Sequence, residues 1–293
     1  MKKLFIAILF SFLLGQDDLL DVLNEGEDQF EYVESAFKST RVANAQSLEI
    51  PKPKILQFMI QHRFGSIENG FYDLFGTDYA IIRYDFNYGF NDLLAAGFGR
   101  SSFDKIYDIF LKVKLLRQSK GSRNIPLSVV LYSDIGIKTY RKSELTPALK
   151  NNFSNRLLYI NHLIIGRKMS RNLSLQIMPT IIYRNLVLNE GEKHQLNSIG
   201  VGGRYKITSK FSINGDYFEA IGDRENGFKN SFSLGFDYET GGHVFQVMIS
   251  NAQGPYEFTF IEKANGNPST STLYLGFNIS RAFSLKGNDS STW

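Results

Sequence analysis

The chain has 293 residues, 43% hydrophobic and 14% aromatic, with a formal net charge of +4 at pH 7. It contains no cysteine, which excludes disulfide bonds, thiolate metal sites, a cysteine nucleophile and a lipidated N-terminal cysteine. The basic residues are scattered rather than clustered, so the sequence gives no case for nucleic acid binding.

Residues 1–15 have the pattern of a secretory signal. Lys2 and Lys3 precede an apolar run from Leu4 to Leu14, and Gly15 is a small residue at the expected cleavage point. The run is too short to cross a bilayer as a helix, and no later segment approaches 18 consecutive apolar residues. We therefore predict a cleaved signal peptide; the alternative is a buried N-terminal strand or helix.

Residues 16–52 form an acidic segment that ends where Pro51 and Pro53 mark a boundary. The acidic residues are concentrated in its first part, Gln16–Glu34: Asp17, Asp18, Asp21, Glu25, Glu27, Asp28, Glu31 and Glu34. Such a charge run is typical of a solvated or disordered arm. We predict a periplasmic arm, or a plug in which Glu25–Glu34 dock against Lys112, Lys114 or Arg204.

From residue 54, apolar and polar residues alternate with a period of two, which is the strand signal. The alternation is clearest before the Asn91-Asp92 turn, where Ile82, Tyr84 and Phe86 share one face. It predicts twelve strands, at about residues 54–64, 78–90, 93–102, 107–116, 127–138, 156–167, 173–184, 195–207, 211–220, 230–239, 243–250 and 272–283. The fifth and sixth are apolar with less clear faces, and Pro179 is a weak point in the seventh.

The connections between these strands differ in length in a regular way. Those after strands two, six, eight and ten are short. Most of those after odd-numbered strands are long: 65–77, 139–155, 186–194, 221–229 and 251–271. Aromatic residues also gather near strand ends: Phe75, Tyr79, Tyr88, Phe90, Tyr107, Tyr183, Tyr205, Phe211, Tyr238 and Phe283.

These features together favour an all-β fold, an antiparallel transmembrane β-barrel of about twelve strands in the outer membrane. An even strand count places both termini in the periplasm. The barrel spans residues 53–283 and is followed by a tail, 284–293. A secreted sandwich is the alternative. The closing strand, which ends in Phe283, resembles the terminal assembly signal of outer-membrane proteins, so the expected partners are outer-membrane lipid and the barrel-assembly machinery.

Several short segments resemble one family, the outer-membrane β-barrels of unknown function found in Bacteroidota. They are Ser35–Arg41, His62–Gly65, Asp73–Gly76, Gly99–Ser102, Lys114–Gln118, Gly242–Gln246 with Asn251, and Gly276–Phe283. The resemblance runs from about residue 30 to 283. It implies the barrel fold and an outer-membrane location, and it brings no substrate and no catalytic residues.

A barrel with its apolar face toward lipid turns its polar face to the lumen. The predicted lumen residues are Gln61, Arg63, Arg83, Asp85, Lys112, Lys114, Arg184, Arg204, Lys206, Asp216, Asp237 and Glu239. Their excess positive charge favours a channel for small polar, anionic or sugar-like solutes. The alternative is an ion-paired, closed lumen, in which Arg83 pairs across strands.

No motif indicates catalysis or a cofactor. His62, His162, His194 and His243 have no metal-ligand spacing, and nothing selects Ser101, Ser102 or Ser250 as a nucleophile. We therefore expect no enzyme, no metal and no cofactor. The first hypothesis is a channel. The second is a non-conducting structural or assembly barrel associated with a surface or secretion system, and the third is an outer-membrane hydrolase.

Overall fold

The computed structural model describes residues 30–141, 144, 152–187, 193–222 and 227–285. The predicted signal peptide, the acidic residues up to Asp28 and the tail from residue 286 lie outside this part of the chain.

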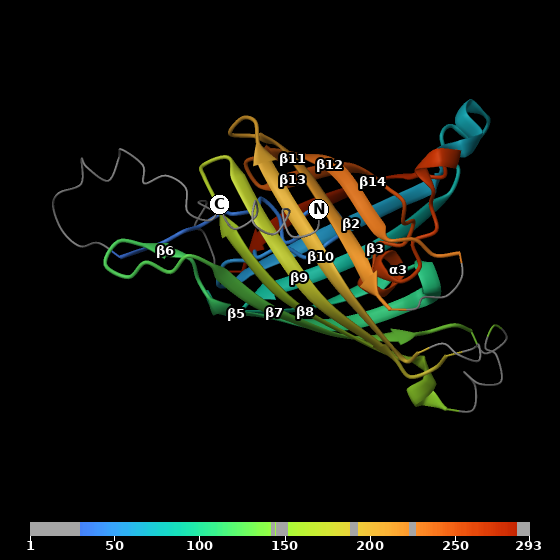
Figure 1. Cartoon of the computed structure of the whole chain (residues 1–293), viewed down its shortest axis with the longest axis horizontal. Helices are drawn as coiled ribbons and strands as arrows, with labels where there is room; N and C mark the ends of the chain where they lie inside the picture. The colour runs from blue at the N-terminus through green and yellow to red at the C-terminus, as the bar shows by residue number, and fades with distance from the viewer. Residues whose placement is uncertain (1–29, 142–143, 145–151, 188–192, 223–226, 286–293) are drawn as a thin grey trace, which may run out of the picture.

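Twelve antiparallel strands form one closed barrel (Figure 1). They are β2 (Ile55–Ser66), β3 (Ala80–Gly89), β4 (Leu94–Ser101), β5 (Ile106–Leu116), β7 (Ser128–Lys138), β8 (Leu157–Lys168), β9 (Leu173–Arg184), β10 (Gln195–Lys206), β11 (Phe211–Ile221), β12 (Ser231–Thr240), β13 (His243–Ser250) and β14 (Tyr274–Ser284). Each strand pairs with its chain neighbour, and β14 closes on β2 with Phe283 opposite Leu56. The predicted strand count and order are confirmed. Pro179 does not interrupt β9, where it lies opposite Ile199.

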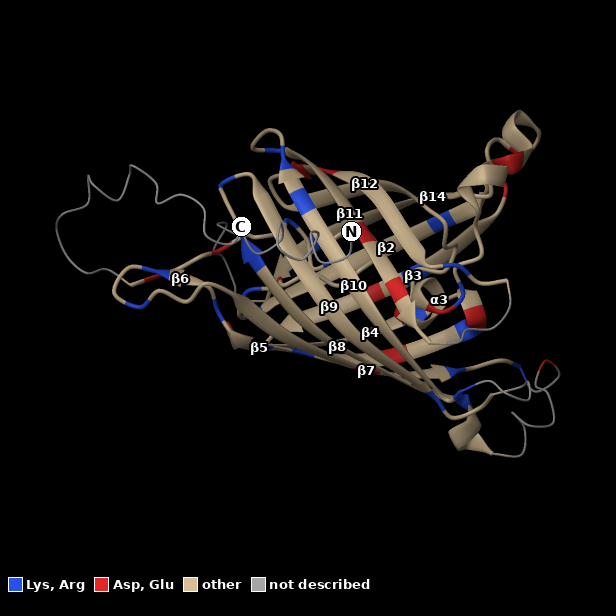
Figure 2. Cartoon of the chain, viewed as in Figure 1, with Lys and Arg blue, Asp and Glu red and all other residues tan. Residues whose placement is uncertain are grey.

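The strands turn their large apolar side chains outward. Ile109 is 70% exposed and Leu234 is 55% exposed, whereas Gln61 and Asn278 are completely buried inside the barrel. A soluble barrel would bury the apolar face instead, so this surface requires lipid. In Figure 2 much of the visible outer wall is uncharged, and many of the Lys and Arg residues lie near strand ends. None of the described helices is long and apolar enough to cross a membrane.

The short turns lie together at one end of the barrel, which we call the turn end, and the longer connections lie at the other, the loop end. At the turn end, Asn91 Oδ1 accepts hydrogen bonds from the Leu93 and Leu94 amides, at 2.8 and 2.9 Å. A two-stranded ribbon of β1 (Glu31–Tyr32) and β6 (Ser119–Lys120) also projects from this end (Figure 1). That the turn end faces the periplasm stays a prediction.

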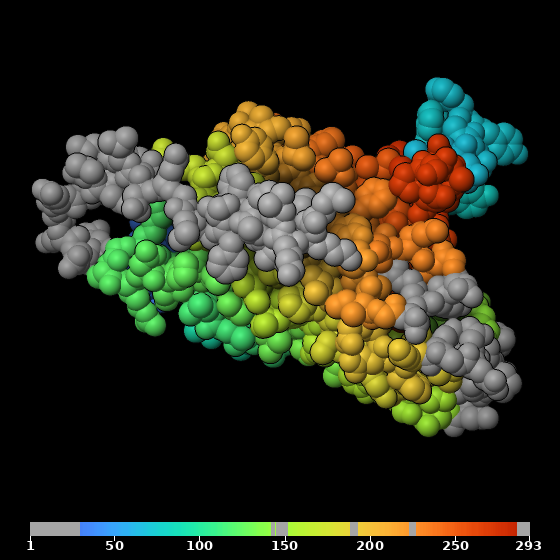
Figure 3. Space-filling model, in the orientation of Figure 1, coloured from blue at the N-terminus to red at the C-terminus, as the bar shows by residue number. Residues whose placement is uncertain are grey.

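Among the described residues, the connections contain five short helices: η3 (Ile67–Asp73), η4 (Phe103–Lys105), η5 (Phe153–Arg156), α3 (Glu257–Ile261) and η6 (Pro268–Thr270). The segment around η3 stands out from the body of the molecule (Figure 3). By contrast, α3 is folded inward, and all five of its residues are buried. The sequence pattern predicted neither element.

Candidate functional site

The interior of the barrel contains a segment from outside the strands. Residues 36–50, which precede β2, are almost entirely buried. They form a tight hairpin in which Arg41 is bridged to Gln46, and the Val42 amide donates to the Ala45 carbonyl at 2.8 Å. We call residues 36–50 the inner hairpin. It belongs to the segment predicted from sequence as an arm or plug.

The wall holds the inner hairpin mainly by its main chain. The Lys112 ammonium on β5 donates to three carbonyl oxygens, those of Thr40, Ser47 and Glu49, at 3.3, 2.9 and 2.8 Å. Lys112 binds the hairpin without an acidic side chain, because carbonyl oxygens accept the hydrogen bonds of its ammonium group. The predicted docking of acidic side chains on Lys112 is not seen for Glu31 and Glu34, which are both exposed.

Asp216 on β11 binds the main-chain N–H groups of the hairpin. One of its carboxylate oxygens accepts hydrogen bonds from the amides of Ala43, Asn44 and Ala45, at 3.2, 2.9 and 3.0 Å. These three residues form the tip of the hairpin. A buried carboxylate is stable in such a place because several N–H groups replace its water.

Amide and guanidinium groups bind four further carbonyl oxygens of the hairpin. Gln246 binds the Val42 carbonyl at 2.9 Å, Asn278 that of Ala43 at 3.0 Å, Gln176 that of Gln46 at 2.7 Å and Arg204 that of Ala36 at 3.2 Å. These residues come from β13, β14, β9 and β10, so the hairpin is tied to opposite parts of the wall.

A second segment enters from the loop end. Residues 252–264, here called the inner loop, carry α3, and Tyr256, Phe258 and Phe260 are buried in the barrel. The two inward segments meet: Arg41 of the hairpin pairs with Glu257 of the loop at 2.7 Å. Gln46 donates to the same carboxylate oxygen at 2.8 Å. The passage is therefore filled from both ends.

An ion-pair network surrounds this meeting point. Arg83 makes a bidentate contact with Asp108, one arm of it at 2.7 Å, and lies 3.5 Å from Asp85. Arg41 also lies 3.5 Å from Asp85. Paired guanidinium and carboxylate groups are the usual form in which charges are tolerated in a dry interior. This matches the closed, ion-paired alternative drawn from the sequence.

Asp134 on β7 joins the inner loop to the wall. It accepts hydrogen bonds from the hydroxyl groups of Tyr132, at 2.9 Å, and Tyr256, at 2.5 Å. Gly136 makes room for the second tyrosine, because a Cβ at that position would lie 2.4 Å from the Tyr256 hydroxyl oxygen. Glycine is required here by close approach.

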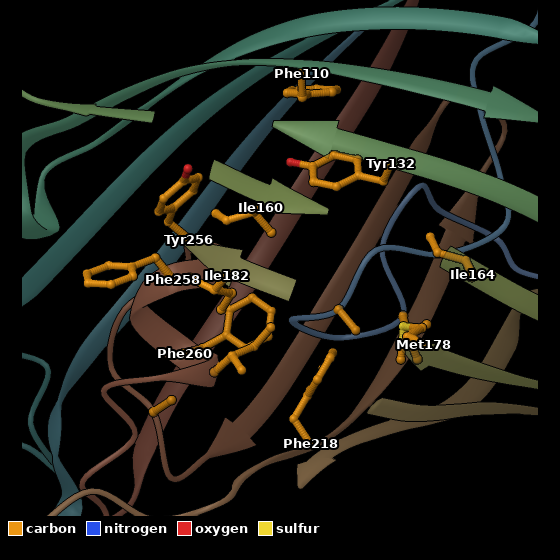
Figure 4. Close-up of a cluster of buried hydrophobic side chains, with 14 of the residues drawn as sticks. Phe110, Tyr132, Ile160, Ile164, Met178, Ile182, Phe218, Tyr256, Phe258 and Phe260 are labelled. Atoms are coloured by element: carbon orange, nitrogen blue, oxygen red, sulfur yellow. The ribbon is translucent and has the colours of Figure 1, made fainter. Parts of the chain in front are cut away.

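One side of the interior is apolar rather than polar. Side chains from β5 and β7–β11 pack against the inner hairpin and inner loop, as Figure 4 shows for Tyr132, Ile160, Met178 and Phe218 around Phe260 of the inner loop. None of the twelve predicted lumen residues accounts for this apolar side, which the sequence analysis did not identify. The signal was present in the fifth and sixth predicted strands, now β7 and β8. Apart from Asp134 and His162, most of their inward side chains are apolar because they meet the inward segments, while the outward face meets lipid.

The twelve predicted lumen residues fall into two groups. Eight are buried: Gln61, Arg63, Arg83, Asp85, Lys112, Arg204, Asp216 and Asp237. Four are half-buried near strand ends: Lys114, Arg184, Lys206 and Glu239. In this second group Arg184 pairs with Glu262 and Glu239 pairs with Lys38. Sequence reasoning left Asp108, Asp134 and Glu257 out of the predicted lumen, although they are central to the interior.

Nothing in the described part of the chain forms a metal site of three or more His, Cys, Asp or Glu residues. His162 is buried, and its Nδ1 contacts the Thr180 hydroxyl at 2.7 Å. The Ser250 hydroxyl forms hydrogen bonds with Asn44, Ser233 and the Phe232 carbonyl. Ser102 Oγ accepts from the Ile82 amide. These histidine and serine residues serve the barrel interior or its rim.

Comparison with known proteins agrees with this architecture. A family model described as a membrane bound beta barrel domain (DUF5777) matches residues 37–283, a range that includes most of the inner hairpin. This confirms the resemblance to a membrane β-barrel family. A search of curated proteins found no match.

Solved structures with a similar fold include three porins or channels. The NanC porin is 10% identical, with a TM-score of 0.49, 78% of this chain covered and 100% of that chain. The KdgM porin is 8% identical, with a TM-score of 0.47 and coverages of 78% and 99%. An outer membrane channel from Pseudomonas putida F1 is 11% identical, with a TM-score of 0.47 and coverages of 80% and 97%. Identities this low do not transfer a solute to this chain.

Proposed function

This chain belongs to the membrane bound beta barrel domain family (DUF5777), and we propose that it is an outer-membrane channel for small polar solutes that its own inner hairpin closes as a plug. The supporting observation is that side chains of the barrel wall bind the main chain of the hairpin on several sides. If the hairpin left the barrel, these side chains would become available to solvent and solute. The proposal implies lipid around the apolar wall and assembly machinery to insert the barrel.

The closed state is supported by the burial of the interior. In a water-filled pore, inward polar side chains are wet. Here Arg63, Arg83 and Lys112 are fully shielded from solvent. A cavity of about 550 Å³ lies at the turn end, between the base of the hairpin and the barrel rim, where Lys114 and Gln118 line it. Space for the hairpin to move therefore exists on the side from which it enters.

The buried charges of the wall bear on solute choice. The four basic residues are Arg63, Arg83, Lys112 and Arg204, and the five acidic residues are Asp85, Asp108, Asp134, Asp216 and Asp237. Among the predicted lumen residues that are buried, four are basic and three are acidic, and once Asp108 and Asp134 are included the acidic residues outnumber the basic ones by one. An opened passage would be nearly balanced in charge and rich in amides and hydroxyls. It is thus better suited to neutral polar solutes than to anions.

A disulfide lock tests whether the hairpin is the plug. The chain lacks cysteine, and Val42 Cγ2 lies 3.4 Å from the position of a Cβ on Gly202 of β10. The two Cβ positions are thus no more than about 5 Å apart, near the separation that a disulfide spans. We expect the oxidised Val42→Cys/Gly202→Cys variant to be silent in planar bilayers. Its reduction should restore the opening events of the wild type.

The single Gly202→Cys variant is the matched control, since it carries the wall change without the lock and should be insensitive to oxidation. Conductance that persists under oxidation would show that solutes pass without movement of the hairpin. Silence of the wild type and of both variants under every condition would instead support the second candidate, a non-conducting structural barrel. The apolar packing of one wall on the inward segments is the observation that favours that candidate.

We infer no catalytic role. Among the described residues, none of the serines singled out in the sequence, Ser101, Ser102 and Ser250, has a hydrogen bond to a histidine. A serine nucleophile depends on such a base. In a screen with ester substrates, the wild type should not hydrolyse esters faster than the Ser250→Ala variant.

A further inference from the structure

The connection between β2 and β3 presents aromatic side chains to the outside. In residues 67–76, here called the aromatic loop, Phe71 is 85% exposed, Tyr72 is 92% exposed and Leu74 is 58% exposed. The loop stands out from the loop end of the barrel (Figure 3), beside the residues that lead into β14, where the Ile67 amide donates to the Leu273 carbonyl at 2.9 Å. Large aromatic side chains so fully exposed at one tip mark an interaction surface.

The aromatic loop is built to hold this shape. The Asp73 carboxylate is buried, and it accepts hydrogen bonds from the Asn69 amide group and the Gly76 N–H, both at 3.0 Å. Phe71 and Phe75 pack edge to face, with ring centroids 4.8 Å apart. A loop with so many internal contacts is not a passive linker.

Its backbone is also strained. Leu74 and Phe75 have φ angles of 49° and 56°, a conformation that bulky residues rarely adopt. The base is closed by the Gly65 amide, which donates to the Gly76 carbonyl at 2.8 Å. Strain of this kind persists where function requires a fixed presentation.

The aromatic loop lies close to the boundary of the lipid bilayer. β2 has 12 residues, and at the usual rise and tilt it covers roughly 30 Å along the membrane normal, against a lipid-facing band of about 25 Å. Its last residue, Ser66, therefore lies near the boundary of the bilayer. The adjoining outward surface is aromatic too, with His62 and Phe64 packed on Phe277, and with Tyr79 67% exposed.

We propose that the aromatic loop inserts Phe71, Tyr72 and Leu74 into the interfacial layer of the membrane leaflet at the loop end, and so anchors that rim of the barrel. Aromatic side chains favour this layer because one part of the ring is apolar and another tolerates water. The exposed apolar tip continues the lipid-facing wall of β2 and β14, and lipid covers both.

Apolar area drives this insertion, not charge. The stretch from Ser66 to Tyr79 contains no lysine or arginine, so no ion pair with an anionic headgroup contributes. Insertion into neutral lipid should thus not depend on salt, and anionic lipid should not strengthen it, unlike the binding of a polybasic segment.

Tryptophan fluorescence tests the proposal in the full barrel. The chain has one tryptophan, Trp293, so Phe71→Trp in a Trp293→Phe background gives a single probe. In neutral phosphatidylcholine vesicles we expect a blue-shifted emission. Brominated acyl chains should quench it several-fold more than they quench the control, with no change in 1 M NaCl.

The control is Phe30→Trp in the same background, because Phe30 adjoins the β1–β6 ribbon that projects from the opposite end and is also exposed. Heat-modifiable migration in detergent gels verifies that both variants are folded. Emission at water-exposed wavelengths with no lipid quenching would overturn the proposal. So would a blue-shifted emission that brominated lipid leaves unquenched, because it would assign the loop to a protein partner or a second copy.

Discussion

At the scale of single residues, the interior of this barrel follows the rules of a protein core rather than those of a pore. Arg83 and Asp108 are both buried and pair with each other, and Lys112 reaches three carbonyl oxygens. Each buried charge finds partners because water does not reach it. The glycines of the strands admit the large side chains that fill the passage, as Gly136 does for Tyr256.

The Gly136–Tyr256 contact makes a sharp prediction at this scale. In Gly136→Ala the new methyl group collides with the Tyr256 hydroxyl, and we expect a loss of about 1–3 kcal/mol in the free energy of unfolding. Tyr256→Phe removes the hydroxyl and relieves the collision, while Asp134 keeps its bond from Tyr132. The double variant should thus cost less than the sum of the two single ones. Urea unfolding in lipid vesicles measures all three, and strict additivity would contradict the contact.

At the scale of elements, the inner loop is tied to the rim of the barrel as well as to its interior. Lys263 donates to Asp104 of η4 at 2.5 Å, Tyr140 donates to the same carboxyl group at 3.1 Å, and Lys138 lies 3.9 Å away. Burial alone raises the pKa of Asp104, but the ammonium groups of Lys263 and Lys138 outweigh it and hold this pKa below its usual value. The inner loop is thereby fixed at the loop end.

This tie predicts a pH dependence. A carboxyl group whose pKa is lower in the folded state contributes stability above its unfolded pKa, about 3.9, and loses it as the pH falls through the folded value. Asp104→Asn should therefore speed hydrogen exchange in residues 251–271 at neutral pH, and the difference from wild type should vanish only below about pH 4. Asp78→Asn, at an exposed position of the same end, should change nothing. If the difference in hydrogen exchange between this variant and the wild type disappears already near pH 6, the Asp104 carboxylate does not hold the inner loop at the rim.

The elements also show why part of this structure could be predicted from sequence and part could not. The period-two alternation identified most of the strands, because lipid on one side and polar groups on the other repeat at every second residue, whereas β7 and β8 were predicted as apolar runs with less clear faces. The inner hairpin has no such period: many of its contacts with the wall run through main-chain atoms, which any sequence provides. The α3 helix has five residues, too few for a helical pattern. Both apolar faces of β8 pointed to something packed inside the barrel.

At the scale of the whole molecule, two segments of the chain itself fill the interior of the barrel. The inner hairpin enters at the turn end, the inner loop enters at the loop end, and they meet through Arg41 and Glu257. Truncating one partner of a buried pair leaves the other charge without compensation, so each segment holds the other in place. The match to the membrane barrel family begins at residue 37, which makes the hairpin part of the family's domain.

The most direct test of this account is single-channel recording of the wild-type barrel beside a variant in which residues 36–50 are replaced by a glycine-serine linker of equal length. We predict a closed wild type with rare openings and a variant that conducts continuously, with weak selectivity for charge. Heat-modifiable migration in detergent gels serves to verify that the variant is folded. A folded variant that remains closed would contradict the central claim, because the inner hairpin would then not be the plug.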